Sequence, residues 1–396
     1  MRILSNDYPA NLPNSEKQLK GGPARFARDF SNYALSKGHE WVGLIHDAKL
    51  RTGMEELGSA PGKRFFSVRG THASFENVFA LAEYPDLDAY FAEELAEIES
   101  VIDRTKPDLL FLNGYSIHAW LIQRAAQKKN LPVIIEHAGL LCREVEAYAD
   151  LYHEAGIQLA KHAERDGAQQ ATINIFLNEF SKEVFEKDAL QGASMEATVI
   201  PLPHAGWSFP DAYARKDREE RIIGVVARWD RIKNHPGVLA FAEEAQKQGL
   251  PWRVQSVTEI PDTQKQLELK TKYREHVEVL PHMDRDAIRA FYESLDVLIV
   301  PSNFDVSPTI VMEGLARGVP SLISPNVGWV SEYRTHGMQD WIVDFADPAQ
   351  AVSALAAQFA RDAWPEVGAL AQYVETAHAP ETVFAEYLSL FERITS

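Results

Sequence analysis

The segment SNFDVSPTIVMEGLARGVP contains two acidic residues, Asp305 and Glu313, that are separated by seven residues. Both could bind the same ligand. The run DVLIVPS before them is typical of a buried strand. Ser307-Pro308 is typical of a helix start, because Ser can cap a helix and Pro suits its first position. Asp305 is therefore expected in the loop after the strand, and Glu313 inside the helix. Both could face a diphosphate held by the free amides at the helix start, or they could only complement the helix dipole in water.

A second loop, ARWDRIKNHPG, places two cations between a strand-like and a helix-like segment. Arg228 and Lys233 lie five residues apart on this strand-to-helix turn, where both can point at one ligand. Two cations there could neutralise the negative charge that develops on a diphosphate leaving group. Taken singly, each is better explained as an ordinary basic surface residue.

Two further motifs could contribute to a ligand site. In VIIEHAG, strand alternation puts His137 at the end of a strand, where it could bond a sugar hydroxyl or move a proton. The alternative is a structural histidine with satisfied hydrogen bonds. In KGGPAR, Gly21 and Gly22 precede the first long helix and let the backbone approach a ligand closely. Neither the Walker motif nor the dinucleotide fingerprint matches this segment.

Composition excludes several other functions. The net charge of −17 argues against nonspecific binding to nucleic acid or to an anionic membrane, because the electrostatic interaction would be repulsive. The lone cysteine, Cys142, excludes an intrachain disulfide and fits a reducing compartment. We find no metal-ligand spacing, no Gly-x-Ser-x-Gly elbow and no Cys/His nucleophile signature, so the chemistry is expected to need no metal.

Strand-like and helix-like segments alternate along the chain, which predicts an α/β fold with doubly wound, mostly parallel sheets. The alternation pauses once, in a Gly-, Pro- and charge-rich stretch, and then restarts. A chain of 396 residues also favours two domains. We therefore predict an N-terminal Rossmann-like domain over 1–203, a linker over 204–221, a C-terminal Rossmann-like domain over 222–379, and a final amphipathic helix over 380–396.

Taken in order, four segments resemble the retaining glycosyltransferases of the GT-B fold, in the large group 1 family with a Glu-x7-Glu motif. They are KGGPARFARDFSNYALSKGHEWVGL, LPVIIEHAG, VVARWDRIKN and YESLDVLIVPSNFDVSPTIVMEGLARGVPSLIS. The resemblance implies two Rossmann-like domains facing a cleft and a last helix that crosses back to the first domain. It also implies transfer of a sugar from a nucleotide-diphosphate sugar to a saccharide or lipid-linked saccharide, with retention of configuration and without a cofactor.

The resemblance implies a role for each residue of the C-terminal motifs. Glu313 would hold the nucleotide ribose, and Asp305 would address the transferred sugar. Arg228 and Lys233 would neutralise the diphosphate. The backbone next to Asp305 would also contact the sugar, namely at Val306, Ser307, Pro308 and Thr309.

For the N-terminal domain, the resemblance implies that His137 contacts the donor sugar and that Gly21 and Gly22 close over donor and acceptor. Asp305 departs from the family pattern, since its side chain is one methylene shorter than the usual Glu. The sequence WRVQSVTEI replaces the usual glycine-rich strand end near the nucleotide base.

Two other functions remain open from the sequence. One is a nucleotide-sugar 2-epimerase, which shares the two-domain plan, and the other is a nucleotide-sugar-binding protein with degenerate chemistry. The start MRILSNDYPA has no apolar signal segment, and no window approaches eighteen apolar residues. We expect a cytoplasmic protein, with at most a weak peripheral contact at the inner face of the membrane. The oligomeric state stays open.

Overall fold

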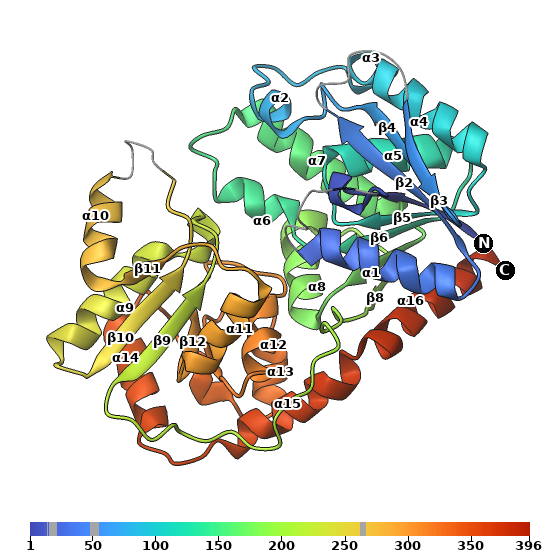
Figure 1. The fold of residues 1–396 in the computed structure, drawn as a ribbon. Helices are drawn as coiled ribbons and strands as arrows, with labels where there is room; N and C mark the ends of the chain where they lie inside the picture. Colours follow the sequence, from blue (N-terminus) through green and yellow to red (C-terminus); the bar gives the residue numbers. More distant parts are fainter. Residues whose placement is uncertain (14, 16–21, 48–54, 262–266) are drawn as a thin grey trace. The chain divides into compact units, whose positions relative to one another are not determined.

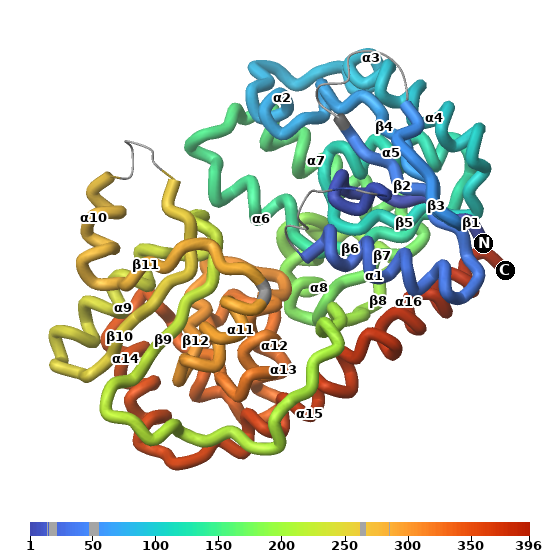
Figure 2. Tube along the Cα trace, viewed as in Figure 1, coloured from blue at the N-terminus to red at the C-terminus, as the bar shows by residue number. Residues whose placement is uncertain are grey.

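The computed structural model describes residues 1–13, 15, 22–47, 55–261 and 267–396 (Figures 1 and 2). The chain divides into two units. Unit 1 comprises Met1–Pro201 with Val383–Ser396, and unit 2 comprises Leu202–Thr382. Within the described ranges, every helix is too short or too polar to cross a membrane.

Unit 1 is built on an eight-stranded sheet with the order β3-β4-β2-β1-β5-β6-β7-β8. All described pairings are parallel except β3 with β4, which form an antiparallel hairpin. The strands are β1 (Arg2–Asn6), β2 (Glu40–Asp47), β3 (Glu55–Ala60), β4 (Lys63–Arg69), β5 (Leu109–Asn113), β6 (Val133–His137), β7 (Ile173–Phe176) and β8 (Ala197–Val199).

Alternate residues of the central strands pack on opposite faces of this sheet, as the doubly wound prediction requires. Leu110 and Leu112 of β5 join the apolar cluster under α4 and α5, whereas Phe111 contacts rings of α1 and α16. The helical elements of unit 1 are η1 (Pro9–Asn11), α1 (Gly22–Ser36), α2 (Phe75–Phe79), α3 (Leu87–Tyr90), α4 (Ala92–Thr105), α5 (Ile117–Lys128), α6 (Leu141–Glu146), α7 (Glu154–Gln170), α8 (Glu179–Phe185) and the π-helical turn η2 (Glu186–Leu190).

The C-terminal helix α16 (Pro380–Thr395) is packed into unit 1 by aromatic contacts. Phe30 of α1 lies 5.5 Å from Phe391 and 5.6 Å from Phe384, measured between ring centroids. Tyr387 also donates a 3.0 Å hydrogen bond to the buried carboxylate of Glu136 on β6. These contacts explain why α16, drawn in red beside α1 in Figure 1, belongs to unit 1 although it follows unit 2 in the chain.

Unit 2 is built on a parallel five-stranded sheet with the order β11-β10-β9-β12-β13. Its strands are β9 (Arg221–Val226), β10 (Trp252–Val257), β11 (Glu278–Leu280), β12 (Val297–Val300) and β13 (Ser321–Ile323). Its helical elements are η3 (Arg231–Lys233), α9 (His235–Lys247), α10 (Leu267–His276), α11 (Arg285–Ser294), α12 (Thr309–Leu315), α13 (Val330–Thr335), η5 (Gln339–Trp341), α14 (Pro348–Phe359) and α15 (Pro365–Ala377).

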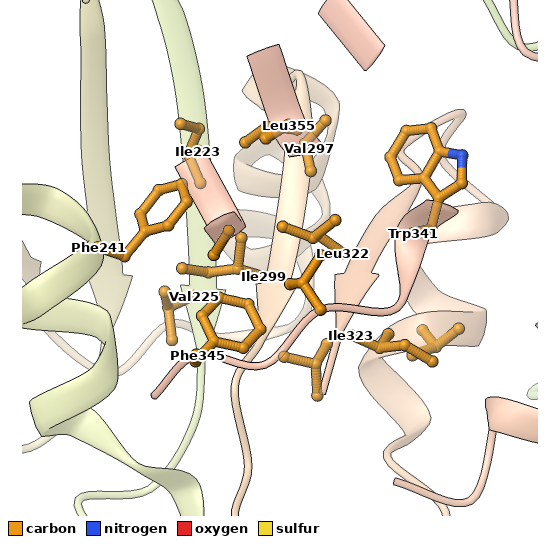
Figure 3. Close-up of a cluster of buried hydrophobic side chains, with 14 of the residues drawn as sticks. Ile223, Val225, Phe241, Val297, Ile299, Leu322, Ile323, Trp341, Phe345 and Leu355 are labelled. Carbon is orange, nitrogen blue, oxygen red and sulfur yellow. The ribbon is translucent and has the colours of Figure 1, made fainter. Parts of the chain in front are cut away.

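The unit 2 sheet is also covered on both faces. Figure 3 shows Val297 and Ile299 of β12 in the cluster that includes Phe241 of α9 and Leu355 of α14. The intervening residue, Leu298, packs on the other face with residues of α11. This alternation fixes the register of β12, because a shift by one residue would exchange its two buried faces.

The stretch predicted as a linker, 204–221, falls within unit 2, and several of its residues anchor it there. The Tyr213 side chain is buried, and its hydroxyl donates to the carbonyl of Leu315 at 2.5 Å. The guanidinium of Arg218 lies 2.6 Å from the buried carboxylate of Asp296. That same carboxylate accepts the backbone N–H of Ile222 at the start of β9. The charge-rich composition suggested a linker, but two of its arginines, Arg218 and Arg221, pair with Asp296.

Gly314 lies where the helix that carries Glu313 passes close to the sheet. A Cβ at this position would lie 2.5 Å from Leu298 Cδ1 and 2.9 Å from the Val319 carbonyl oxygen. Gly314→Ala should therefore push α12 outward and lower the free energy of unfolding by about 1–3 kcal/mol, the usual cost of overpacking. Chemical denaturation measures this loss.

Gly368→Ala is the matched control on α15. Its Cβ would meet the Tyr213 side chain only at 3.8 Å, an ordinary contact. This substitution should be neutral or stabilising by up to about 1 kcal/mol, because Ala favours a helix over Gly. Equal stability of the two variants would contradict the proposed close approach of α12.

Candidate functional site

The site is positioned by the parallel pairing of β9 with β12, which places the loops after both strands at one edge of the unit 2 sheet. The two loops are joined by hydrogen bonds. The N–H of Asn303 donates to the carbonyl of Ile232 at 2.7 Å, and the side-chain amide of Asn234 donates to the carbonyl of Pro301 at 3.0 Å. The loop that carries Lys233 is therefore held against the loop that carries Asp305.

Lys233 and Asp305 form an ion pair across these loops, with Nζ 2.5 Å from Oδ2. Their side chains are 22% and 15% exposed, so the pair is partly shielded but still reachable. Asp305 is fixed through its backbone as well, because its N–H donates to Asn326 at 3.1 Å and its carbonyl accepts from Gly328 at 2.9 Å. A lysine and an acid predicted to act on different parts of one ligand thus contact each other directly.

Arg228 stands in the same loop but is held much more loosely. Its side chain is 83% exposed, and its Nη2 lies 3.9 Å from the carboxylate of Asp230. Only its backbone is anchored, through the hydrogen bond between its carbonyl and Nε2 of His235 at 2.8 Å. An exposed guanidinium on an anchored backbone can turn toward an incoming anion at little cost.

Glu313 lies on α12 and is half-buried. The Tyr292 hydroxyl donates to its Oε2 at 2.6 Å, and the Thr309 hydroxyl donates to its Oε1 at 3.4 Å. Two donors on separate helices thus orient the carboxylate. The second of these bonds is weak, which leaves Oε1 able to accept from a ligand hydroxyl.

The segment between the two acids differs in one detail from the prediction. Ser307 does not cap α12, which begins at Thr309 with Pro308 as its N-cap and without a side-chain capping bond. Val306 is buried, and the carbonyl of Pro308 accepts from Trp329 Nε1 at 3.2 Å. Pro308 already has the geometry of the residue before a helix, so a serine cap is not needed.

The role predicted for His137 needs correction, because its side chain is completely buried in unit 1. Its ring stacks on Phe176 with centroids 4.5 Å apart. The side-chain amide of Asn174 donates to backbone carbonyls, so its Oδ1 is the acceptor for His137 Nε2 at 2.9 Å. Burial lowers the pKa of His137 to about 4. A neutral, enclosed ring cannot contact a donor sugar, and His137 is a core residue here.

The Gly-Gly motif lies partly outside the described residues, because Gly21 is not among them. Gly22 opens α1 and is exposed, and a Cβ there would meet none of the described residues within 4 Å. The structure therefore leaves open space at Gly22, as close approach of a ligand would require.

Sequence reasoning missed three residues that hold the site together. Asn234 has a left-handed backbone (φ 55°) and caps α9 through Gly237 N–H, while its amide bridges to Pro301. Tyr292 orients Glu313, and Trp329 holds the loop before α12. The local signal for Asn234 was its place between a turn and a helix, but Tyr292 and Trp329 act across long sequence separations that no local spacing reveals.

The described residues contain no group of three or more His, Cys, Asp or Glu side chains arranged to hold a metal ion. The polar residues that unit 2 provides are thus two cations and one acid on neighbouring loops, with a second acid, Glu313, on α12. Such a set can neutralise a diphosphate and accept hydrogen bonds from sugar hydroxyls.

Comparison with solved structures identifies the fold. Sucrose-phosphate synthase from Thermosynechococcus elongatus matches with a TM-score of 0.70 and 14% identity, over 99% of this chain and 98% of that one. A UDP-forming α,α-trehalose-phosphate synthase from Burkholderia xenovorans matches with a TM-score of 0.68 and 12% identity, over 100% and 99%. Each unit is an α/β structure with a wholly or mostly parallel sheet. Together with the matches, this arrangement defines the GT-B fold and confirms the predicted fold class.

Residues 211–366 match the family model described as "Glycosyl transferases group 1". This segment lies within unit 2 and contains Arg228, Lys233, Asp305 and Glu313. This segment is thus similar to the group 1 glycosyltransferases, as the motifs predicted. A search of the curated proteins gave no match.

The buried state of His137 predicts a pH dependence of stability. Its pKa of about 4 in the folded protein lies below its ordinary value of 6.5, so between these values the unfolded chain binds more protons. The free energy of unfolding should therefore fall as the pH drops from 6.5 to 4, by about 3 kcal/mol for this group. Urea unfolding at a series of pH values, compared between the wild type and His137→Phe, isolates this contribution from the other histidines. An identical pH dependence in both proteins would show that folding does not lower the pKa of His137.

Proposed function

We propose that the protein transfers a sugar from a nucleotide-diphosphate sugar to a saccharide or lipid-linked saccharide acceptor with retention of anomeric configuration. The observation that carries this proposal is the Lys233–Asp305 ion pair beside the exposed Arg228, on the loops after β9 and β12. Solved neighbours of the same fold support it. One is titled as a UDP-forming synthase, and another, from E. coli, is titled as bound with UDP-2-fluoro glucose.

In this proposal the ion pair changes partners when the donor binds. The diphosphate carries more charge than a carboxylate, so it competes for the Lys233 ammonium while Arg228 turns toward it from solvent. Asp305, released from Lys233, then accepts hydrogen bonds from hydroxyls of the transferred sugar. Glu313 accepts from the ribose hydroxyls, with Tyr292 keeping its carboxylate in place.

The proposed reaction needs no protein nucleophile. The bond between the anomeric carbon and the diphosphate oxygen breaks, and the acceptor oxygen bonds to that carbon on the same face. The acceptor proton moves to the leaving phosphate oxygen. The protein contributes positioning and neutralisation of the charge that develops on the diphosphate.

Donor binding and transfer can be tested directly. A panel of nucleotide sugars is screened by the shift in melting temperature, since a ligand that binds only the folded state raises it. The best donor is then incubated with saccharide acceptors, and the anomeric configuration of the product is determined by NMR. Formation of a new nucleotide sugar in the absence of acceptor would instead indicate an epimerase, and a product of inverted configuration would contradict retention.

Replacement of Lys233 is the most direct test of whether this residue neutralises the diphosphate. Lys233→Ala should lower kcat by about 100-fold or more, because it removes a cation from the leaving group and leaves Asp305 unpaired. Lys247→Ala is the matched control, since Lys247 is an exposed lysine on α9 that pairs with Glu244 on the same helix. Near-native turnover in Lys233→Ala would remove the assignment of Lys233 to the diphosphate.

Asp305 offers a finer test, because its charge and its length can be changed separately. Asp305→Glu keeps the carboxylate that pairs with Lys233 and should retain part of the activity. Asp305→Asn loses the charge and should lower kcat/KM about tenfold or more below Asp305→Glu, since a charged acceptor bonds a hydroxyl more strongly than an amide does. If the two variants have the same kcat/KM in steady-state kinetics, the charge of Asp305 has no role in transfer.

A further inference from the structure

Unit 1 contains a polar cavity whose lining includes none of the predicted donor-site residues. It has a volume of about 700 Å³ and is bordered by α6, α7 and η2. This volume is ample for a small organic ligand. The charged groups along its walls are Arg143, Lys161, Arg165, Lys187, Glu146 and Asp188.

The cations in this cavity outnumber the carboxylates, although the whole chain has a net charge of −17. Arg143 pairs with Asp188 at 2.6 Å, and Lys161 pairs with Glu146 at 3.0 Å. In the part of the chain that the structure describes, Arg165 and Lys187 take part in no ion pair. Two uncompensated cations therefore face the same cavity.

The walls of the cavity are held together by a buried acid. The carboxylate of Glu164 on α7 is fully buried and accepts the backbone N–H groups of Leu141 and Cys142 at 2.6 and 2.7 Å. These bonds fix the start of α6, which carries Arg143, against α7, which carries Lys161 and Arg165. Arg143, Lys161 and Arg165 thus stand on two helices with a set relative position.

We propose that this cavity binds a soluble phosphomonoester, such as a phosphorylated sugar. A phosphate dianion matches the two free cations in charge, and the guanidinium of Arg165 can bond two of its oxygens at once. The side chains of Gln158 and Gln191, which also line the cavity, suit the hydroxyls of a sugar. All residues that line the cavity lie in unit 1, whereas Lys233 lies in unit 2.

Calorimetric titration of the full-length protein with glucose 6-phosphate tests the proposal, with glucose as the uncharged comparison. The ester should bind and glucose should not, and the affinity should fall as salt is added. The double variant Arg165→Gln, Lys187→Gln should raise the Kd at least about tenfold, since each charge-assisted bond contributes more than a neutral one. Both side chains are exposed, so this variant should keep the wild-type melting temperature.

A matched double variant, Lys37→Gln with Lys128→Gln, removes the same charge from exposed positions of unit 1 outside the cavity. Its Kd for the ester should equal that of the wild type. If both double variants raised the Kd for the ester equally, the effect would come from the overall charge of the protein. That result would overturn the proposal. So would the absence of ester binding to the wild type, or binding only to vesicles that contain phosphatidic acid.

Discussion

The parallel pairing of β9 with β12 is the constraint on which the site depends. Parallel neighbours end at the same edge of a sheet, so the two loops that follow them meet, although more than seventy residues separate them in the chain. Backbone bonds between Asn303 and Ile232, and the side chain of Asn234, then hold the loops together. The Lys233–Asp305 ion pair follows from this arrangement, because neither loop could present its charge to the other without the pairing.

Burial separates the polar residues of the chain into two groups. Arg228 and the ion pair remain accessible at the ends of strands, where a ligand can replace water around them. His137 and Glu136 also lie at a strand end, but the first is enclosed by Phe176 and the second is bonded to Tyr387 of α16. The ends of β6 are covered from within unit 1, so position at a strand end is not sufficient for contact with a ligand.

The strands and long helices were largely predictable, because each combines a clear apolar period with a cap or a turn residue at its end. The run RIIGVVAR and the strand β9 coincide, as do DVLIVPS and β12, since buried parallel strands are continuously apolar. The hairpin of β3 and β4 escaped notice, because β3 is mostly exposed and carries little apolar signal. The stretch over 204–221 was assigned to a linker from its Gly, Pro and charged residues, whereas its Arg218 and Arg221 pair with the buried Asp296.

By itself the sequence determined the fold class, the group 1 motifs and the identity of the charged residues in the loops after β9 and β12. These properties depend on local spacing, which the order of residues contains directly. Only the tertiary structure decided which of these residues meet. It paired Lys233 with Asp305, oriented Glu313 through Tyr292 and enclosed His137 in the core. Such contacts join residues that are distant in the chain, and their geometry is set by how the sheets and helices pack.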